Sequence, residues 1–292
     1  MKRLIVNADD LGMSAGINRG ILEAHHEGIV SSSTVMVNMA AAREGIRQAQ
    51  RDAPALGLGL HFNLSYGRPL SDPAEIPSLV RSNGNFVPVT RGLGLPHLLR
   101  AEDIRAELTE QFERFCDYAG CLPDHLDSHQ LVGSLSAECR EVMLDLAERY
   151  QLSVRQGGRT LFSQLERDFA SRGSVQKTLA PALFRRYPLQ RHSHIFEREV
   201  RTTDYFEYRF HAETATVEQL LRILETLPDG VTELVCHPGY LGGEEDGYGQ
   251  RERELAALTD SRVKAKVAAK GVVLTTFASL ASAPQLVASG TD

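Results

Sequence analysis

The chain has 292 residues, of which 42% are hydrophobic and 24% charged, enough apolar material for one large α/β domain or two small ones. The net charge of −6 does not suggest a nucleic-acid partner or an acidic membrane surface. No apolar run is long enough to span a bilayer. The first apolar run is soon interrupted by Asn and Asp, unlike a signal peptide, so a cytoplasmic protein is predicted.

Four cysteines are present, Cys116, Cys121, Cys139 and Cys236, and none forms a CxxC pair. In a chain of this length, such spacing favours reduced core thiols over a disulfide framework or a zinc knot.

Apolar runs and helical periodicities alternate along most of the chain. Ser14 is a plausible N-cap of the first helix, and Gly28 a plausible stop. In chain order, the predicted elements are strand Leu4–Asn7, helix Ser14–Glu27, strand Ser32–Met39, helix Ala40–Arg51, strand Leu56–Leu64, helix Ala101–Ala119, strand His125–Gln130, helix Ser136–Tyr150, strand Leu152–Arg155, strand Tyr205–His211, helix Val217–Leu227, strand Thr232–His237, helix Gln250–Lys270 and strand Val272–Phe277.

About seven strands that alternate with helices or loops predict an α/β fold, a distorted or incomplete (β/α) barrel of TIM-barrel type. A doubly wound open sheet is the main alternative, although no GxGxxG supports a dinucleotide site. We expect a single domain, 1–292, with excursions at about 65–100 and 156–201.

Polar residues follow several of the predicted strands. In a parallel barrel the carboxyl ends of all strands meet on one face, which holds the active site. The residues at these ends are Asp9, Asp10, His61, Asp127, His129, Arg155 and His237.

Each of these residues could instead have a purely structural role. His61 could be a satisfied histidine in a packed site, His237 could shape a turn, and Asp127 could cap the next helix. Their joint placement favours a functional site, because chance would scatter them. Five further histidines are scattered and are predicted to be surface or loop residues; they are His25, His26, His97, His192 and His194.

The adjacent carboxylates of Asp9 and Asp10 repel each other, so a cation is expected beside them, either an arginine or a metal ion. Neighbours in a regular strand point to opposite faces. At a strand end this rule relaxes, and Gly12 lets the chain turn. Both carboxylates can then serve one pocket.

An Asp and two His with open positions suit a divalent metal in a hydrolase. The histidines favour zinc or another transition metal, and the carboxylate leaves magnesium or manganese open. A second carboxylate is then needed as a base, and a separate acid must protonate the leaving group.

Four short motifs, "NADDLG", "GLGLHFNL", "HLDSHQ" and "CHPGY", occur in this order from the first strand to the last third of the chain. In this order they resemble the signatures of the YdjC-like carbohydrate deacetylases, which include chitooligosaccharide and hopanoid-biosynthesis deacetylases. The resemblance implies a distorted (β/α) barrel that binds one divalent metal ion, zinc or magnesium, and removes the acetyl group of an N-acetylated sugar. It also implies a homodimer.

The resemblance further implies roles for individual residues. Asp9 would be the general base that acts on the metal-activated water, and His237 the acid that protonates the departing amine. Arg155 is expected to orient or hold the two aspartates. The implied metal ligands are Asp10, His61 and His129.

The chain departs from the family pattern in one place. Relatives often continue the third motif with further histidines at alternate positions, where this chain has Leu131 and Gly133. The first histidine of this alternating series, His129, is present, so we expect the metal site to be retained and the substrate contacts to differ. Tyr205 and Phe206 could line the sugar site or belong to the core.

Three other functions fit the sequence less well. A two-metal phosphoesterase would need more ligands. In a glycosidase, the two carboxylates must flank the scissile bond, which adjacent aspartates do not do. A non-catalytic sugar-binding protein would need no acid–base pair, and the absence of Trp weakens any long-glycan site.

Overall fold

The computed structural model describes residues 1–88, 99–155, 198, 200–241 and 248–282. The predicted excursion at 156–201 lies almost entirely outside these residues, and that at 65–100 is described except for 89–98. His97, His192 and His194 also lie outside the described residues.

The described strands form one parallel sheet in the order β5-β4-β3-β2-β1-β7-β6, and β8 pairs with the first residues of β1. At the two edges, Ser153 makes an isolated parallel bridge to Arg201, just before β6, so the sheet curls toward closure. The strands are β1 Lys2–Leu11, β2 Ser32–Val35, β3 Gly57–Phe62, β4 His125–Ser128, β5 Ser153–Val154, β6 Tyr205–Glu207, β7 Gly230–Cys236 and β8 Val273–Leu274.

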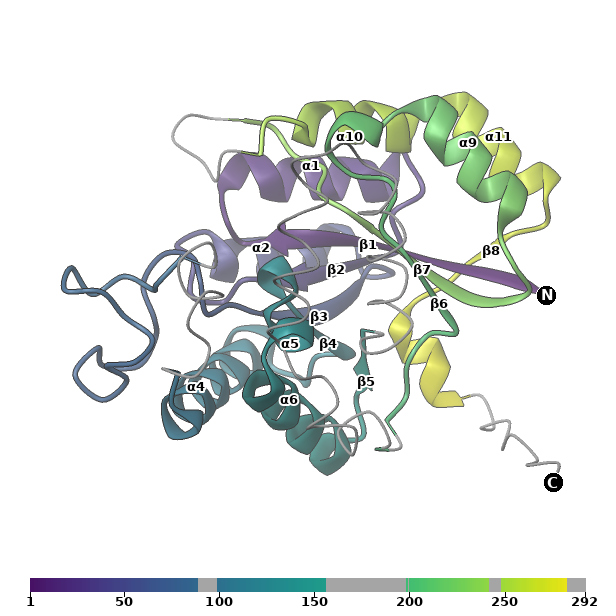
Figure 1. Cartoon of the computed structure of the whole chain (residues 1–292). Coiled ribbons are helices and arrows are strands. Elements are labelled where there is room, and N and C mark those ends of the chain that lie inside the picture. The colour runs from purple at the N-terminus through teal and green to yellow at the C-terminus, as the bar shows by residue number, and fades with distance from the viewer. Residues whose placement is uncertain (89–98, 156–197, 199, 242–247, 283–292) are drawn as a thin grey trace, which may run out of the picture.

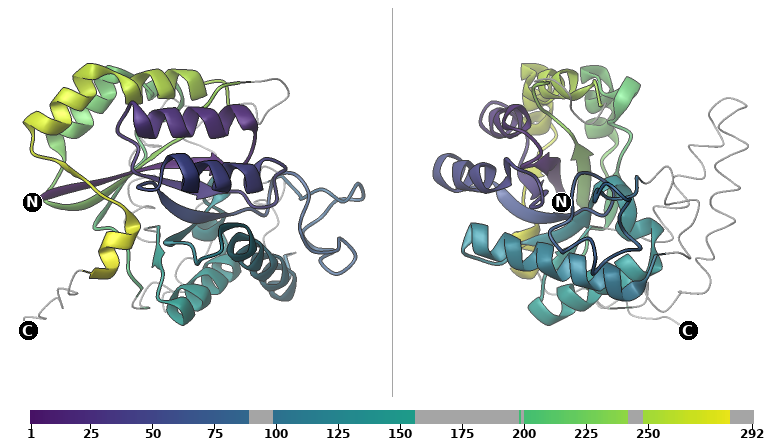
Figure 2. Two further views of the ribbon diagram at one scale, coloured as in Figure 1. Left: turned by 180° about the vertical axis from the view of Figure 1, so that it is seen from behind. Right: turned by 90° about the vertical axis from the view of Figure 1, so that its left-hand side faces the viewer.

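Helices follow the convex side of this curled sheet, as Figures 1 and 2 show, and bury a continuous apolar core against it. The prediction of an incomplete (β/α) barrel is therefore confirmed. The helices are α1 Ala15–His26, α2 Ala42–Asp52, α4 Ala101–Ala119, α5 Val132–Leu135, α6 Ala137–Tyr150, α9 Val217–Thr226, α10 Arg251–Thr259 and α11 Ser261–Ala269, with 3-10 turns at His129–Leu131, Ala212–Thr214 and Phe277–Ser282.

One predicted helix is wrong in its continuity. Gln250–Lys270 is two helices, because Asp260 adopts an extended conformation between them. Its carboxylate accepts a hydrogen bond from the main-chain N–H of Arg262 at 2.8 Å and so caps α11. Aspartate stabilises a helix as its N-cap but is unfavourable in a helix interior, so two helices that meet at Asp260 are more stable than one continuous helix.

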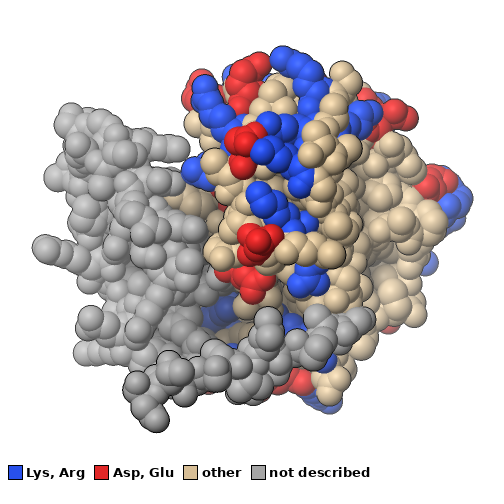
Figure 3. Space-filling view, turned by 90° about the vertical axis from the view of Figure 1, so that its right-hand side faces the viewer, with Lys and Arg blue, Asp and Glu red and all other residues tan. Residues whose placement is uncertain are grey.

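Figure 3 shows acidic and basic side chains interspersed on the described part of one face. Charged side chains also pair between helices of the described chain: Glu225 of α9 contacts Lys266 and Lys270, and Glu218 lies 3.6 Å from Arg262. Within the described chain, no helix combines the length and the apolar character needed to cross a membrane.

Candidate active site

The structure brings together all six residues for which the sequence suggested a role. Asp9 and Asp10 lie near the end of β1, His61 on β3, and His129 directly after β4. Arg155 follows β5 and His237 follows β7. The parallel arrangement of these strands places every one of these side chains at the same mouth of the half-barrel.

The two aspartates share this mouth because the backbone of β1 is irregular there. The strand runs through both residues to Leu11, further than predicted, but Asp10 has φ +74°. The pairing register with β2 shifts between Ala8 and Leu11. A left-handed aspartate inside a strand is uncommon, and such strain concentrates at functional sites. The irregularity breaks the alternation that would otherwise point the two carboxylates to opposite faces.

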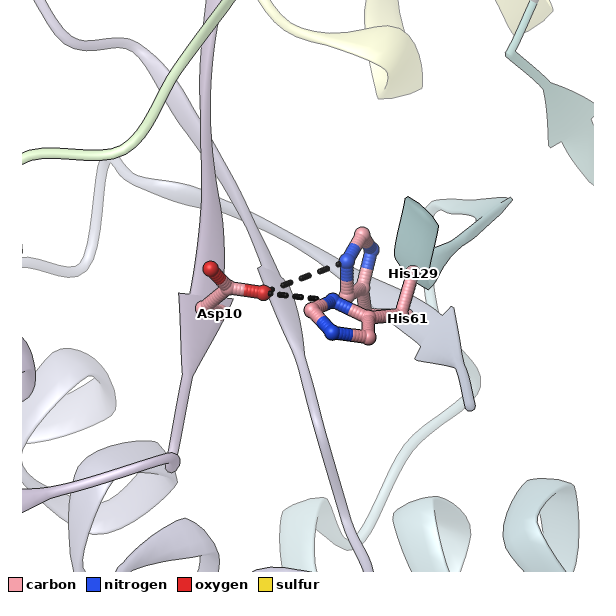
Figure 4. A group of neighbouring side chains, drawn as sticks. All are labelled: Asp10, His61 and His129. Carbon is pink, nitrogen blue, oxygen red and sulfur yellow. Dashed lines mark hydrogen bonds and ion pairs between the residues drawn. The ribbon is translucent and has the colours of Figure 1, made fainter. Parts of the chain in front are cut away.

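Asp10, His61 and His129 point toward one another (Figure 4). The Oδ1 atom of Asp10 lies 3.0 Å from Nδ1 of His129 and 3.4 Å from Nε2 of His61. All three side chains are buried. A tetrahedral zinc site with bonds of about 2.1 Å separates its ligand atoms by about 3.4 Å. The spacing of these atoms therefore fits a divalent ion.

The surroundings of His61 support the same conclusion. Its Nδ1 lies 2.7 Å from Oδ1 of Asp127, to which it is paired in register across β3 and β4. A carboxylate on one nitrogen leaves the other nitrogen for a metal, as is usual for metal-bound histidines. Burial alone would lower the pKa of His61, but the carboxylates of Asp127 and Asp9 have the larger effect and raise this pKa to about 10. The carboxylates of Asp127 and Asp9 thus stabilise a positive charge at His61.

Arg155 is the cation that accompanies Asp9. Its Nη1 and Nη2 atoms donate to the two oxygens of Asp9 at 2.8 and 2.7 Å. Nη2 also lies 2.8 Å from Asp127, and Nε donates to Glu233 at 2.6 Å. Burial raises the pKa of Asp9, but Arg155 and His61 lower it well below its usual range. Asp9 is therefore ionised throughout the neutral pH range.

Asp10 has a different partner. Arg251, from the first turn of α10, donates from Nη2 to Oδ2 of Asp10 at 2.6 Å, and its side chain is almost completely buried. Burial raises the pKa of Asp10, whereas Arg251 and His129 hold it well below its usual range. Arg155 was expected to orient both aspartates. In the described structure it contacts Asp9 of the pair, and Arg251 contacts Asp10.

His237 faces Asp9 from β7. Its Nε2 lies 4.0 Å from Oδ2 of Asp9. Its main-chain N–H donates to Oε2 of the buried Glu254 at 2.5 Å, and its Nδ1 lies 3.8 Å from Oε1 of the same residue. Burial lowers the pKa of His237, but Glu254 raises it more, so the net shift is upward. The imidazolium form is favoured, which suits a proton donor.

Four residues of this network were not singled out from the sequence. The Thr34 hydroxyl on β2 lies 3.1 Å from Asp127 and 3.2 Å from Nδ1 of His61. Polar residues inside apolar strands were the available signal for Thr34 and for Glu233. Nothing local marks the helix residues Arg251 and Glu254, since the site residues that they contact, Asp10 and His237, lie 241 and 17 positions away, respectively.

The structure shows the surroundings of Gly133, one of the two positions that depart from the family pattern. A Cβ atom there would lie 2.3 Å from the sulfur of Met143 on α6, so a longer side chain would require this methionine side chain to move. Leu131 packs against Phe206 and Val235 instead. Phe206 is buried beneath Arg155, whose Cζ lies 5.7 Å from the ring centroid, which supports the core interpretation of this residue.

The sequence is similar to known proteins over nearly its whole length. A family model described as YdjC-like protein matches residues 3–269. A carbohydrate deacetylase from Geobacillus stearothermophilus is 38% identical over 94% of this chain and 96% of its own. A chitooligosaccharide deacetylase from Proteus mirabilis is 33% identical over 95% and 98%, respectively.

Solved structures agree with the fold. A crystal structure from Enterococcus faecalis, named provisionally as a cellobiose-phosphate cleavage protein, is 28% identical and covers 96% of this chain and 98% of its own, with a TM-score of 0.79. A family 4 carbohydrate esterase from Streptomyces lividans shares the fold at 15% identity, covering 94% and 92%, with a TM-score of 0.50. The extent of the family match and the order of the site residues lead to one conclusion: the chain belongs to the YdjC-like protein family.

Proposed function

We propose that this chain is a metal-dependent carbohydrate deacetylase that hydrolyses the acetyl amide of an N-acetylated sugar of the N-acetylglucosamine type. The names of its relatives support the reaction class. The observation that carries the proposal is geometric. A carboxylate and a histidine, Asp9 and His237, face each other at 4.0 Å beside three convergent metal-ligand atoms.

Asp10, His61 and His129 would hold one divalent ion, zinc or magnesium. Such an ion polarises a carbonyl oxygen and lowers the pKa of water from 15.7 to about 7. The chain supplies the rest of the site. Arg251 fixes the outer oxygen of Asp10, and Asp127 fixes the tautomer of His61.

The proton transfers fall to Asp9 and His237. Asp9, held ionised by Arg155, accepts a proton from the attacking water. His237 donates a proton to the sugar nitrogen as the carbon–nitrogen bond breaks, so that acetate and a free amine leave. Positioned acid–base groups of this kind contribute about 10² to 10⁴ in rate.

Acetate release tests this function. We expect the protein to release acetate from at least one N-acetylated mono- or disaccharide in a panel supplied with Zn²⁺, Mg²⁺ or Co²⁺. Chelation should abolish turnover, and added metal should restore it. An active protein that contains no metal by elemental analysis would contradict the mechanism. Binding of these sugars without acetate release would instead indicate a sugar-binding protein.

A second prediction concerns the loop that carries His237. This loop lies directly on α1: a Cβ atom at Gly20 would lie 2.5 Å from the Cα of Gly239. Because backbone meets backbone here, Gly20→Ala must displace the loop. Displacements of about 1 Å can cost up to about 10²-fold in rate. We expect kcat for acetate release to fall by about 10- to 100-fold, with the metal content unchanged.

Gly249→Ala is the matched control for this variant, because a Cβ atom there would have no neighbour within 4 Å among the residues that the structure describes. Its kcat should remain at the wild-type value. Equal kcat values for the two variants would show that packing against α1 does not position His237.

Two further properties remain predictions. We propose a homodimer and a cytoplasmic location, both expected from the sequence. Light scattering on the purified protein would measure the first, and fractionation of the producing cells the second.

A further inference from the structure

Outside the trio of Asp10, His61 and His129, a second group of metal-ligand atoms lies at the same mouth of the half-barrel. It consists of His211, which follows β6, His237, which follows β7, and Glu254 of α10. One atom from each of these side chains lies within 4.8 Å of the others. The group shares His237 with the proposed active site but contains none of the three ligands proposed above.

The two nitrogens of His237 face different groups. Nε2 points toward Asp9, from which it is separated by 4.0 Å, whereas Nδ1 lies 3.8 Å from Oε1 of Glu254. Within the described part of the chain, Nδ1 is buried and has no hydrogen-bond partner. A buried ring nitrogen without a partner is costly, and an electrophile beside it would remove that cost.

Glu254 is held in place for such a role. It is completely buried, and its carboxylate accepts hydrogen bonds from the main-chain N–H of His237 and from the hydroxyl of Tyr248. Tyr248 in turn accepts a hydrogen bond from the main-chain N–H of Ala212 at 2.8 Å. These contacts tie together the three segments that carry the second group.

Two imidazoles and one carboxylate form a donor set that zinc prefers in proteins. We propose that His211, His237 and Glu254 form a second, inhibitory site for a transition-metal ion such as Zn²⁺. The binding part of this proposal stands on the geometry alone, and the inhibitory part rests on the proposed role of His237 as the acid.

Binding at the second site should be weaker than at the first. His211 is exposed, its ring stacks on Tyr248 with centroids 5.0 Å apart, and it takes part in a capping box over Ala212–Thr214. A metal ion has to compete with these contacts. The ligands of the first site are all buried and already converge. We therefore expect the second ion to bind only when zinc is in excess.

Occupation of this site would remove the proton donor. A zinc ion bound at Nδ1 of His237 would take the place of the proton on that nitrogen and would hold the ring against Glu254 and His211. His237 would then no longer serve as the proton donor to the amine, and turnover would fall.

The test uses the full-length protein, stripped of metal and dialysed against increasing Zn²⁺, with bound zinc measured by elemental analysis. We expect two ions per chain in the wild type, the second with lower affinity, and one ion in His211→Ala. His26→Ala is the matched control, because His26 is also exposed but lies at the end of α1. It should bind two ions.

Acetate release is followed on the same samples. Wild type and His26→Ala should lose at least about 10-fold in rate as the second ion binds, and His211→Ala should keep its rate. A wild type that saturates at one ion, a His211→Ala variant that binds two, or a second ion without inhibition would overturn the proposal. A second ion that disappears in His211→Ala would establish the site even if no sugar were deacetylated, an outcome that would overturn only the proposed function.

Discussion

Asp9→Asn should lower kcat for acetate release by about 10² to 10⁴ while the protein still binds its metal ion. An amide cannot accept the proton of the attacking water, and Asp9 is not among the three proposed ligands. Arg155 keeps its contacts with Asp127 and Glu233, so its charge is not left unpaired. The measurements are kcat and bound metal per chain on the same preparation.

Loss of stability is the competing explanation for such a result, since breaking a buried ion pair costs about 3 kcal/mol or more. Asp103→Asn is a suitable control. Asp103 is equally buried but lies on α4, where it accepts a hydrogen bond from the main-chain N–H of Ser78. If both variants unfold at a lower urea concentration but only Asp9→Asn loses kcat, the effect is chemical. A kcat within a few-fold of wild type would exclude Asp9 as the base.

His237→Ala should lower kcat for an N-acetylated sugar by about 10² to 10⁴ and spare an activated acetate ester. The sugar nitrogen must be protonated to leave, whereas a nitrophenolate leaves without a proton. The comparison is between acetate release from the sugar and the hydrolysis of 4-nitrophenyl acetate, with bound metal measured alongside. Equal losses on both substrates would assign His237 to positioning and not to proton donation.

The pH profile checks the same role. The folded-state pKa of His237 is raised, so its protonated form is complete at low pH and is lost as the pH rises through the raised value. Wild-type kcat for the sugar should therefore decline on the alkaline side at a pH above about 6.5, the ordinary value for histidine. His125→Gln is the control, because His125 is also buried but is the first residue of β4, at the end of the strand away from the candidate site. It should lose stability and keep the alkaline limb.

The sequence alone was sufficient to predict the architecture and the convergence of the candidate residues at one end of the sheet. Alternating strands and helices indicate a parallel sheet, and polar residues that follow apolar runs must gather where the strand ends meet. Both inferences depend on the local spacing of apolar and polar residues, which repeats about every two residues in strands and every three to four in helices. Local pattern failed where capping decided the outcome, as at Asp260, which ends one helix and begins another.

Only the tertiary structure decided which partner each carboxylate has. The sequence left an arginine and a metal ion as alternatives for Asp9 and Asp10. The structure places arginines beside both, Arg155 at a separation of 146 positions and Arg251 at 241, and still leaves one oxygen of Asp10 facing two histidines. Contacts of this range depend on how strands and helices pack in three dimensions. No local periodicity records them, because the energy that selects them arises only when the whole sheet has curled and excluded water from the mouth of the half-barrel.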